Sequence, residues 1–96
     1  VWAPRAAKDL NRILTYIHKR SPSGARNVAL DIDRAVSTCA SRPFSGAKTK
    51  TPQVFRHPMR GRRITIFYRV VIDRGVVQIV RIVRSGRVKS LRRVPD

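Results

Sequence analysis

The sequence predicts a small α+β domain, in which an N-terminal antiparallel helix hairpin packs on a small, mainly antiparallel β-sheet. Apolar residues recur at helical spacing from Ala6 to Cys39, and they follow strand spacing in a basic meander from Val54 to Arg87. A chain of 96 residues makes one domain, residues 1–96, with a small core. Its 42% hydrophobic content is too high for a disordered basic tail.

The first helix begins near Pro4, because proline suits a first helical turn, where its missing N–H is not needed. The segment 21–24 breaks the helix, and Ser21 or Ser23 can cap the next one. One face of the first helix is apolar and the other is basic. The apolar face consists of Ala6, Leu10, Ile13, Leu14 and Ile17, and the basic face of Lys8, Arg12, Lys19 and Arg20.

The second helix ends near Ser41-Arg42-Pro43 and also has a strong apolar period. The two helices should form an antiparallel hairpin. Residues 44–52 read as a flexible loop without a phosphate-loop motif. The apolar stripe of the second helix is Ala25, Val28, Ala29, Ile32, Ala35, Val36 and Cys39.

The last two strands should form a hairpin around a three-residue loop, Asp73-Arg74-Gly75, with Gly75 in the left-handed conformation. Ile72 then pairs with Val76, and the two residue numbers of each cross-strand pair add up to 148. The core face of this register is Ile64, Ile66, Tyr68, Val70, Ile72, Val76, Val80 and Ile82. The other face carries Thr65, Phe67, Arg69 and Val71 opposite Val83, Arg81, Ile79 and Val77. That second face is either a binding surface or a face that its arginines merely cover.

The net charge of +17 predicts an acidic partner, which is nucleic acid, an acidic protein, or both. Seventeen of the 22 basic residues are Arg, which makes planar, bidentate contacts with phosphates and carboxylates. The sequence has no signal peptide and no membrane-spanning apolar run. The single cysteine, Cys39, suits a reducing cytoplasm and a packing role. Because the sequence begins at Val1-Trp2 without Met, we expect part of a first strand to be missing.

The order of these motifs resembles the ParE/RelE superfamily of bacterial toxin–antitoxin systems, and more closely its ParE branch. The resemblance spans nearly the whole chain, and its motifs are specific by order and spacing rather than singly. The matching residues are Trp2, Ala6 or Ala7, Asp9-Leu10, Tyr16-Ile17, Ser21-Pro22, Ala25, Pro43, Gly46, Val54, Arg56, Ile66 to Val70 and Ile79 to Ile82.

The ribonuclease branch of this superfamily depends on a set of basic residues and on a C-terminal Tyr. This chain departs from both features. Thr65 stands where the sheet arginine is expected, and Arg93 stands near the tyrosine position. Arg56 and Arg87 could bind phosphate, but Arg is a poor proton carrier. His57 is the alternative base, although a lone His before Pro is more often a loop residue. Arg84 also stands where the family often has His.

The resemblance implies a cytoplasmic bacterial toxin that inhibits DNA gyrase by binding, without catalysis, cofactor or metal. It also implies a cognate antitoxin with an acidic, disordered tail, and the sequence leaves contact with nucleic acid open. Two alternatives stay open: a RelE-like ribosome-dependent mRNA endonuclease, and a generic basic nucleic-acid-binding domain. The expected partner-binding residues are Arg56, Phe67, Arg69, Arg81, Arg84 and Arg87.

Overall fold

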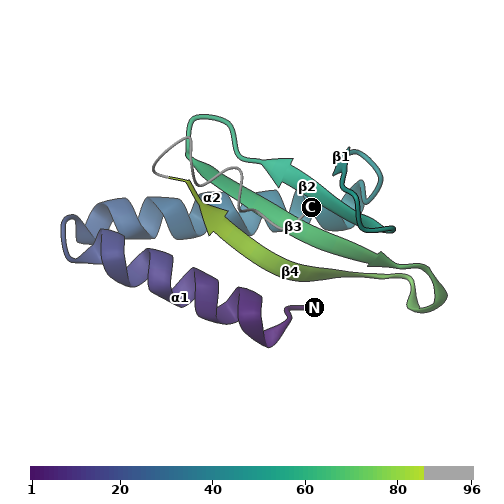
Figure 1. The fold of residues 1–96 in the computed structure, drawn as a ribbon. Coiled ribbons are helices and arrows are strands. Elements are labelled where there is room, and N and C mark those ends of the chain that lie inside the picture. The colour runs from purple at the N-terminus through teal and green to yellow at the C-terminus, as the bar shows by residue number, and fades with distance from the viewer. Residues whose placement is uncertain (86–96) are drawn as a thin grey trace.

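A computed structural model describes residues 1–85, which form two layers: a helix hairpin and one four-stranded sheet (Figure 1). The sheet order is β1-β2-β3-β4, and each neighbouring pair is antiparallel. The predicted fold class is therefore confirmed. The elements are α1 (Pro4–His18), α2 (Pro22–Ser41), β1 (Ala47–Lys48), β2 (Val54–Pro58), β3 (Ile64–Val71) and β4 (Val76–Arg84).

Both helix starts follow from the local sequence. Pro4 occupies the first turn of α1, as predicted. Ser21 is the N-cap of α2, and its Oγ accepts a hydrogen bond from the Gly24 N–H at 2.9 Å. A cap of this kind stabilises a helix by about 1 kcal/mol. No helix among residues 1–85 is long and apolar enough to cross a membrane.

The core lies between the helix hairpin and one face of the sheet. The predicted apolar stripes of both helices point into it, and Ile32 of α2 is only 2% exposed. Cys39 is buried in the same cluster, which confirms its packing role. The sheet supplies Phe55, Ile64, Ile66, Tyr68, Val70, Ile79 and Ile82.

The β3–β4 register confirms half of the prediction and corrects the other half. From Ile64↔Arg84 to Phe67↔Arg81 the pairs add to 148, as predicted. A bulge between Phe67 and Tyr68 then shifts the pairing by one residue, so that Tyr68 faces Ile79 and Val71 faces Val76. The extra residue on β4 is Val80, since no β3 residue pairs with it.

The bulge changes which residues face the core. Ile79 is buried, 1% exposed, in the place predicted for Val80. Ile72 was predicted to be a core residue, and this was wrong, because it begins a short 3-10 turn (Ile72–Arg74) and is 61% exposed. Gly75 closes that turn with φ of +62°, the left-handed conformation predicted for it.

The segment predicted as a flexible loop contains a short strand. β1 pairs Ala47 with Arg56 and Lys48 with Phe55. Just before β1, the Gly46 N–H donates to the Tyr68 hydroxyl at 3.1 Å. A Cβ at Gly46 would lie 2.5 Å from that hydroxyl, so the close approach requires glycine.

The N-terminal residues extend the sheet at its β4 edge. Trp2 forms a parallel bridge with Ile79, the Ile79 N–H donates to the Val1 carbonyl at 2.8 Å, and the Ala3 N–H donates to the Ile79 carbonyl at 2.9 Å. This short parallel pairing protects part of an edge that would otherwise expose unpaired backbone groups.

Candidate partner-binding surfaces

The outer face of the sheet brings three predicted site residues into one row. Arg56 on β2 faces Phe67 on β3, which faces Arg81 on β4. Arg56 and Arg69 are exposed on this face. Phe67 is only 2% exposed and lies outside the helix-side core cluster, so its ring offers almost no surface to a partner. The arginines are therefore the accessible part of this predicted site.

Arg81 does not extend freely from the sheet, because it pairs with a buried carboxylate. Its Nε donates to Asp9 Oδ2 at 2.8 Å, and the Ile82 N–H donates to the same oxygen at 3.0 Å. Asp9 lies on α1, and its side chain is 4% exposed. This carboxylate joins α1 to the β4 edge and neutralises one predicted site arginine. No sequence pattern predicted this pair, although Asp9 belongs to a family motif.

Arg84 turns toward α1. Its guanidinium carbon lies 4.6 Å from the centre of the Tyr16 ring, and the Arg20 guanidinium carbon lies 4.3 Å from the same centre. Tyr16 is 44% exposed. Attraction between a cation and an aromatic face holds both arginines near the ring. Arg87, the last predicted site residue, lies outside the described residues.

Arg56 and His57, the two described residues that were considered for catalysis, are not brought together. Arg56 and His57 are neighbours on β2, so their side chains point to opposite faces of the sheet. Arg56 is exposed on the outer face and His57 is half-buried. Among residues 1–85, no group of three His, Cys, Asp or Glu side chains could hold a metal ion.

Two buried groups in the core also titrate. Burial raises the pKa of the Cys39 thiol to about 11, so the thiol is protonated at neutral pH. Burial likewise raises the pKa of Tyr68, with a smaller contribution from nearby Cys39, and the Gly46 N–H acts in the opposite direction. Both groups are neutral packing residues, and Tyr68 also anchors the start of β1.

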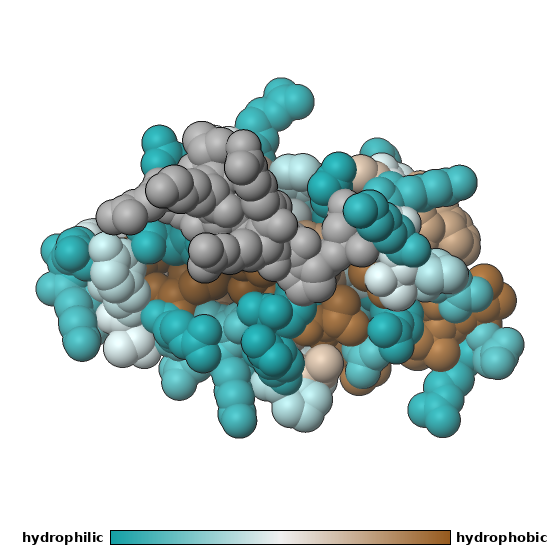
Figure 2. Space-filling view, in the orientation of Figure 1, coloured by the Kyte–Doolittle hydropathy of each residue, from teal (hydrophilic) through white to brown (hydrophobic). Residues whose placement is uncertain are grey.

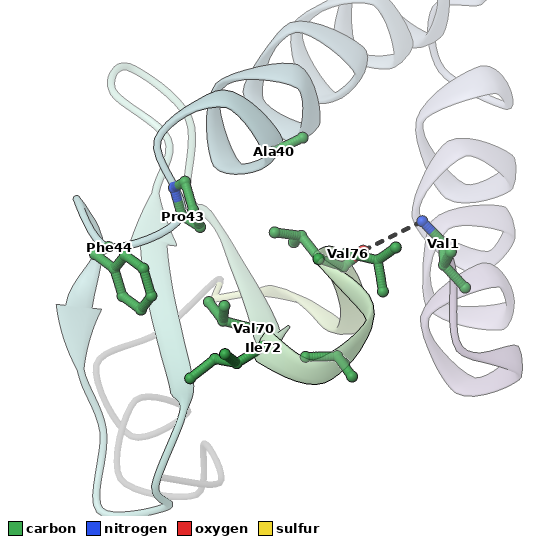
Figure 3. Close-up of a pocket in the computed structure, with 10 residues that line it drawn as sticks. Val1, Ala40, Pro43, Phe44, Val70, Ile72 and Val76 are labelled. Carbon is green, nitrogen blue, oxygen red and sulfur yellow. Dashed lines mark hydrogen bonds between the residues drawn. The ribbon is translucent and has the colours of Figure 1, made fainter.

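An apolar cleft of about 490 Å³ lies between the end of α2 and the β3–β4 hairpin tip (Figure 3). Phe44 and Ile72 stand at its rim and are 64% and 61% exposed. Figure 2 shows hydrophobic surface at this end of the molecule. Sequence reasoning missed the cleft, because its walls come from segments far apart in the chain. The lining residues are Val1, Ala40, Pro43, Phe44, Val70, Val71, Ile72, Gly75, Val76 and Val77.

The described residues thus form a basic domain in which a helix hairpin packs on one antiparallel sheet. Residues 1–88 match the family model described as the ParE toxin of the type II toxin–antitoxin system parDE. The chain belongs to this family. No curated protein matches the sequence.

Solved structures of toxin–antitoxin proteins share this fold. The chromosomal ParDE system from P. aeruginosa aligns with a TM-score of 0.75 at 24% identity, covering 88% of this chain and 92% of that chain. The isolated E. coli RelE toxin aligns with a TM-score of 0.65 at 12% identity, covering 97% and 94%. The intact E. coli RelBE complex gives 0.64 at 12% identity, covering 90% and 94%.

Proposed function

We propose that this protein is a toxin that inhibits DNA gyrase by binding to it, and that a cognate antitoxin neutralises it. The observation that carries the proposal is the ParE family match over residues 1–88. The TM-score of 0.75 to the ParDE structure, against 0.65 and 0.64 for the two RelE structures, supports the ParE branch. A protein that binds these two partners would act in the bacterial cytoplasm.

Binding without catalysis fits the placement of the polar residues. A ribonuclease needs a proton donor and acceptor near one phosphate. Arg56 and His57 lie on opposite faces of the sheet, and Thr65 stands where the resemblance expects an arginine. We assign partner contact to Arg56 and Arg69 on the outer face and to Arg84 at the end of β4. Arg87, which lies outside the described residues, completes the proposed set.

The antitoxin is expected to be acidic, because the toxin carries a net charge of +17. A disordered acidic segment that folds along the toxin would reduce the self-repulsion of this charge. Antitoxin binding should therefore raise the apparent stability of the toxin, and the association rate should fall as salt rises. Association rates that stay constant from low to high salt would remove the electrostatic part of the proposal.

The cellular test is controlled expression of the protein followed by two parallel measurements. Gyrase inhibition predicts growth arrest with chromosomal DNA breaks, intact transcripts and rescue by the antitoxin. Growth arrest with mapped, codon-specific transcript cuts and unbroken DNA would contradict the proposal and favour a RelE-like endonuclease. A folded wild-type protein that causes neither DNA breaks nor transcript cuts would favour a generic nucleic-acid-binding domain.

A paired variant tests the assigned residues. Arg84→Glu with Arg87→Glu should abolish toxicity and leave the fold intact. Arg84 is exposed, and exposed substitutions usually change stability by about 0.5 kcal/mol or less. Arg42→Glu with Arg74→Glu removes the same charge from exposed positions on other elements and should keep toxicity. Equal loss of toxicity in both variants would show that total charge, and not the end of β4, is what the target recognises.

A further inference from the structure

The flank of α1 beside β4 carries cations at four-residue spacing. Lys8, Arg12 and Tyr16 follow one another on the helix, and Arg20 comes four residues later in the turn after α1. Residues four apart lie one above another on a helix, so Lys8 to Tyr16 spans about 12 Å. All four side chains are exposed. We call these four residues the α1 ridge, and Figure 2 shows hydrophilic side chains projecting where Figure 1 places α1.

Tyr16 holds two arginines close together without an acid between them. The distances of 4.3 Å and 4.6 Å to its ring centre mean that the guanidinium carbons of Arg20 and Arg84 lie no more than about 9 Å apart. Neither pairs with a carboxylate in the part of the chain that the structure describes. Asp9 is the only acidic residue of α1, and it is buried against Arg81. The exposed surface of the ridge is therefore free of negative charge.

Arg12 of the ridge and Arg84 also share a hollow between α1 and β4. Arg12, Arg81 and Arg84 line this cleft of about 200 Å³, with Asp9 at its base bound to Arg81. Arg12 and Arg84 are exposed at this cleft. Arginine forms paired hydrogen bonds with the oxygens of a phosphate. Arg12 and Arg84 lie beside one hollow, and Lys8 and Arg20 extend the row of cations in both directions. Together these side chains can contact several phosphates in succession.

We propose that the α1 ridge together with Arg84 is a binding surface for the phosphate backbone of duplex DNA. A length of about 12 Å along a duplex holds three to four phosphates per strand, which matches the reach of the ridge. Contacts of this kind position a protein on DNA without reading its sequence. The inference goes beyond the proposed gyrase inhibition, because it concerns DNA alone and another group of residues, with Arg84 as the one shared residue.

The chemistry of the ridge favours phosphate over an acidic protein. Protein interfaces have an apolar centre within a polar rim. On α1 the apolar residues Leu10, Leu14 and Ile17 are packed against the core, which leaves Tyr16 as the only large apolar surface on the ridge. Exposed apolar side chains, among them Phe44 and Ile72, lie instead at the cleft near the β3–β4 tip. A row of cations with one aromatic ring suits a nucleic-acid backbone.

The test compares two variants of equal charge by fluorescence anisotropy with a short labelled duplex of scrambled sequence. One variant combines Lys8→Ala, Arg12→Ala and Arg20→Ala, and leaves Arg84 in place. The control combines Arg42→Ala, Lys48→Ala and Arg74→Ala, which are exposed on other elements. Alanine preserves the helix at the α1 positions, and circular dichroism confirms folding.

The ridge variant should bind duplex DNA at least about tenfold more weakly, and its slope of log K against log salt should fall by about 2–3 between 50 and 200 mM salt. The control should change the slope by less than about 1. Equal losses in the two variants would overturn the proposal, because generic charge would then explain binding. Unchanged binding by the ridge variant would overturn it as well.

Two further measurements test the role of the Tyr16 ring and the chemical class of the ligand. Tyr16→Phe keeps the aromatic face and should bind like the wild type, whereas Tyr16→Leu should bind about two- to fivefold more weakly. Equal binding by these two variants would contradict the role of the ring. Polyglutamate should compete poorly at equal charge. If it displaces the duplex as well as unlabelled DNA does, the surface recognises acidic protein, and the phosphate assignment fails.

Discussion

Replacing Asp9 by alanine would remove the only buried charged side chain among residues 1–85. The carboxylate accepts one hydrogen bond from the Ile82 N–H at 3.0 Å and one from Arg81 Nε at 2.8 Å. Ile82 lies on the edge strand β4, so its N–H has no further strand beside it. The substitution therefore leaves a buried donor unsatisfied, and it also removes a polar link between α1 and the sheet edge.

The expected loss follows from these contacts. A buried donor left without a partner costs about 1–3 kcal/mol, and breaking a fully buried ion pair costs about 3–5 kcal/mol. Arg81 keeps 26% of its side chain exposed, so water can still solvate it and the full pair cost does not apply. We predict a fall of about 2–4 kcal/mol in the free energy of unfolding, measured by urea denaturation.

Two comparison variants accompany this measurement. Asp9→Asn keeps an oxygen that can accept both hydrogen bonds and should lose only about 1 kcal/mol. Asp31→Ala removes a carboxylate that is 36% exposed and pairs with Arg62 at 2.7 Å, and it should lose about 1 kcal/mol or less. If Asp9→Ala and Asp31→Ala lose the same stability, the role of Asp9 as a buried link between α1 and β4 is refuted.

Three other predictions concern the core. Ile32→Asp should unfold the domain because it buries an unpaired charge, whereas Leu30→Asp on the same helix should not, since Leu30 is 51% exposed. Equal melting temperatures for the two variants would contradict the assigned helix faces. Tyr68→Phe should lose about 1 kcal/mol in chemical denaturation, because Gly46 loses its acceptor, and an unchanged midpoint would argue against this bond. Burial raises the pKa of the Cys39 thiol from its ordinary value of 9.0 to about 11, so the folded state holds the thiol proton more tightly. Stability should therefore fall as pH rises from about 9 to 11, and Cys39→Ala should reduce that fall; an equal fall in the variant would show that other groups cause it.

The helices could be predicted because each has a single apolar stripe. On α2, the seven residues of the predicted stripe from Ala25 to Cys39 recur at helical spacing, and all seven are buried or half-buried. The cap was predicted as either Ser21 or Ser23, and the structure assigns it to Ser21, directly before Pro22. In both cases the signal is local, so one segment contains all the information that the prediction requires.

The bulge in β4 could not be predicted, because this strand lacks a clear alternation. Val76-Val77 and Ile79-Val80 are apolar on both faces, and a one-residue shift therefore gives an equally plausible pattern. The shift decides that Ile79 and not Val80 enters the core. The two-residue strand β1 was missed for a related reason, since two residues are too short for a period.

The candidate surfaces depended on tertiary contacts. Arg81 and Arg84 were both identified as basic residues of the last strand, but the sequence did not show that one binds Asp9 and the other lies over Tyr16. These contacts join residues more than sixty positions apart. The family resemblance supplied the class of protein, while the placement of each arginine required the folded chain.

Gyrase supercoiling measured with the purified protein is the most direct test of the central claim. Increasing toxin should inhibit supercoiling of relaxed plasmid, and prior addition of the antitoxin should restore it. The same preparation, added to ribosomes that carry messenger RNA, should leave the transcript intact. Uninhibited supercoiling with codon-specific cleavage of ribosome-bound transcript would contradict the assignment of this chain as a gyrase-binding toxin.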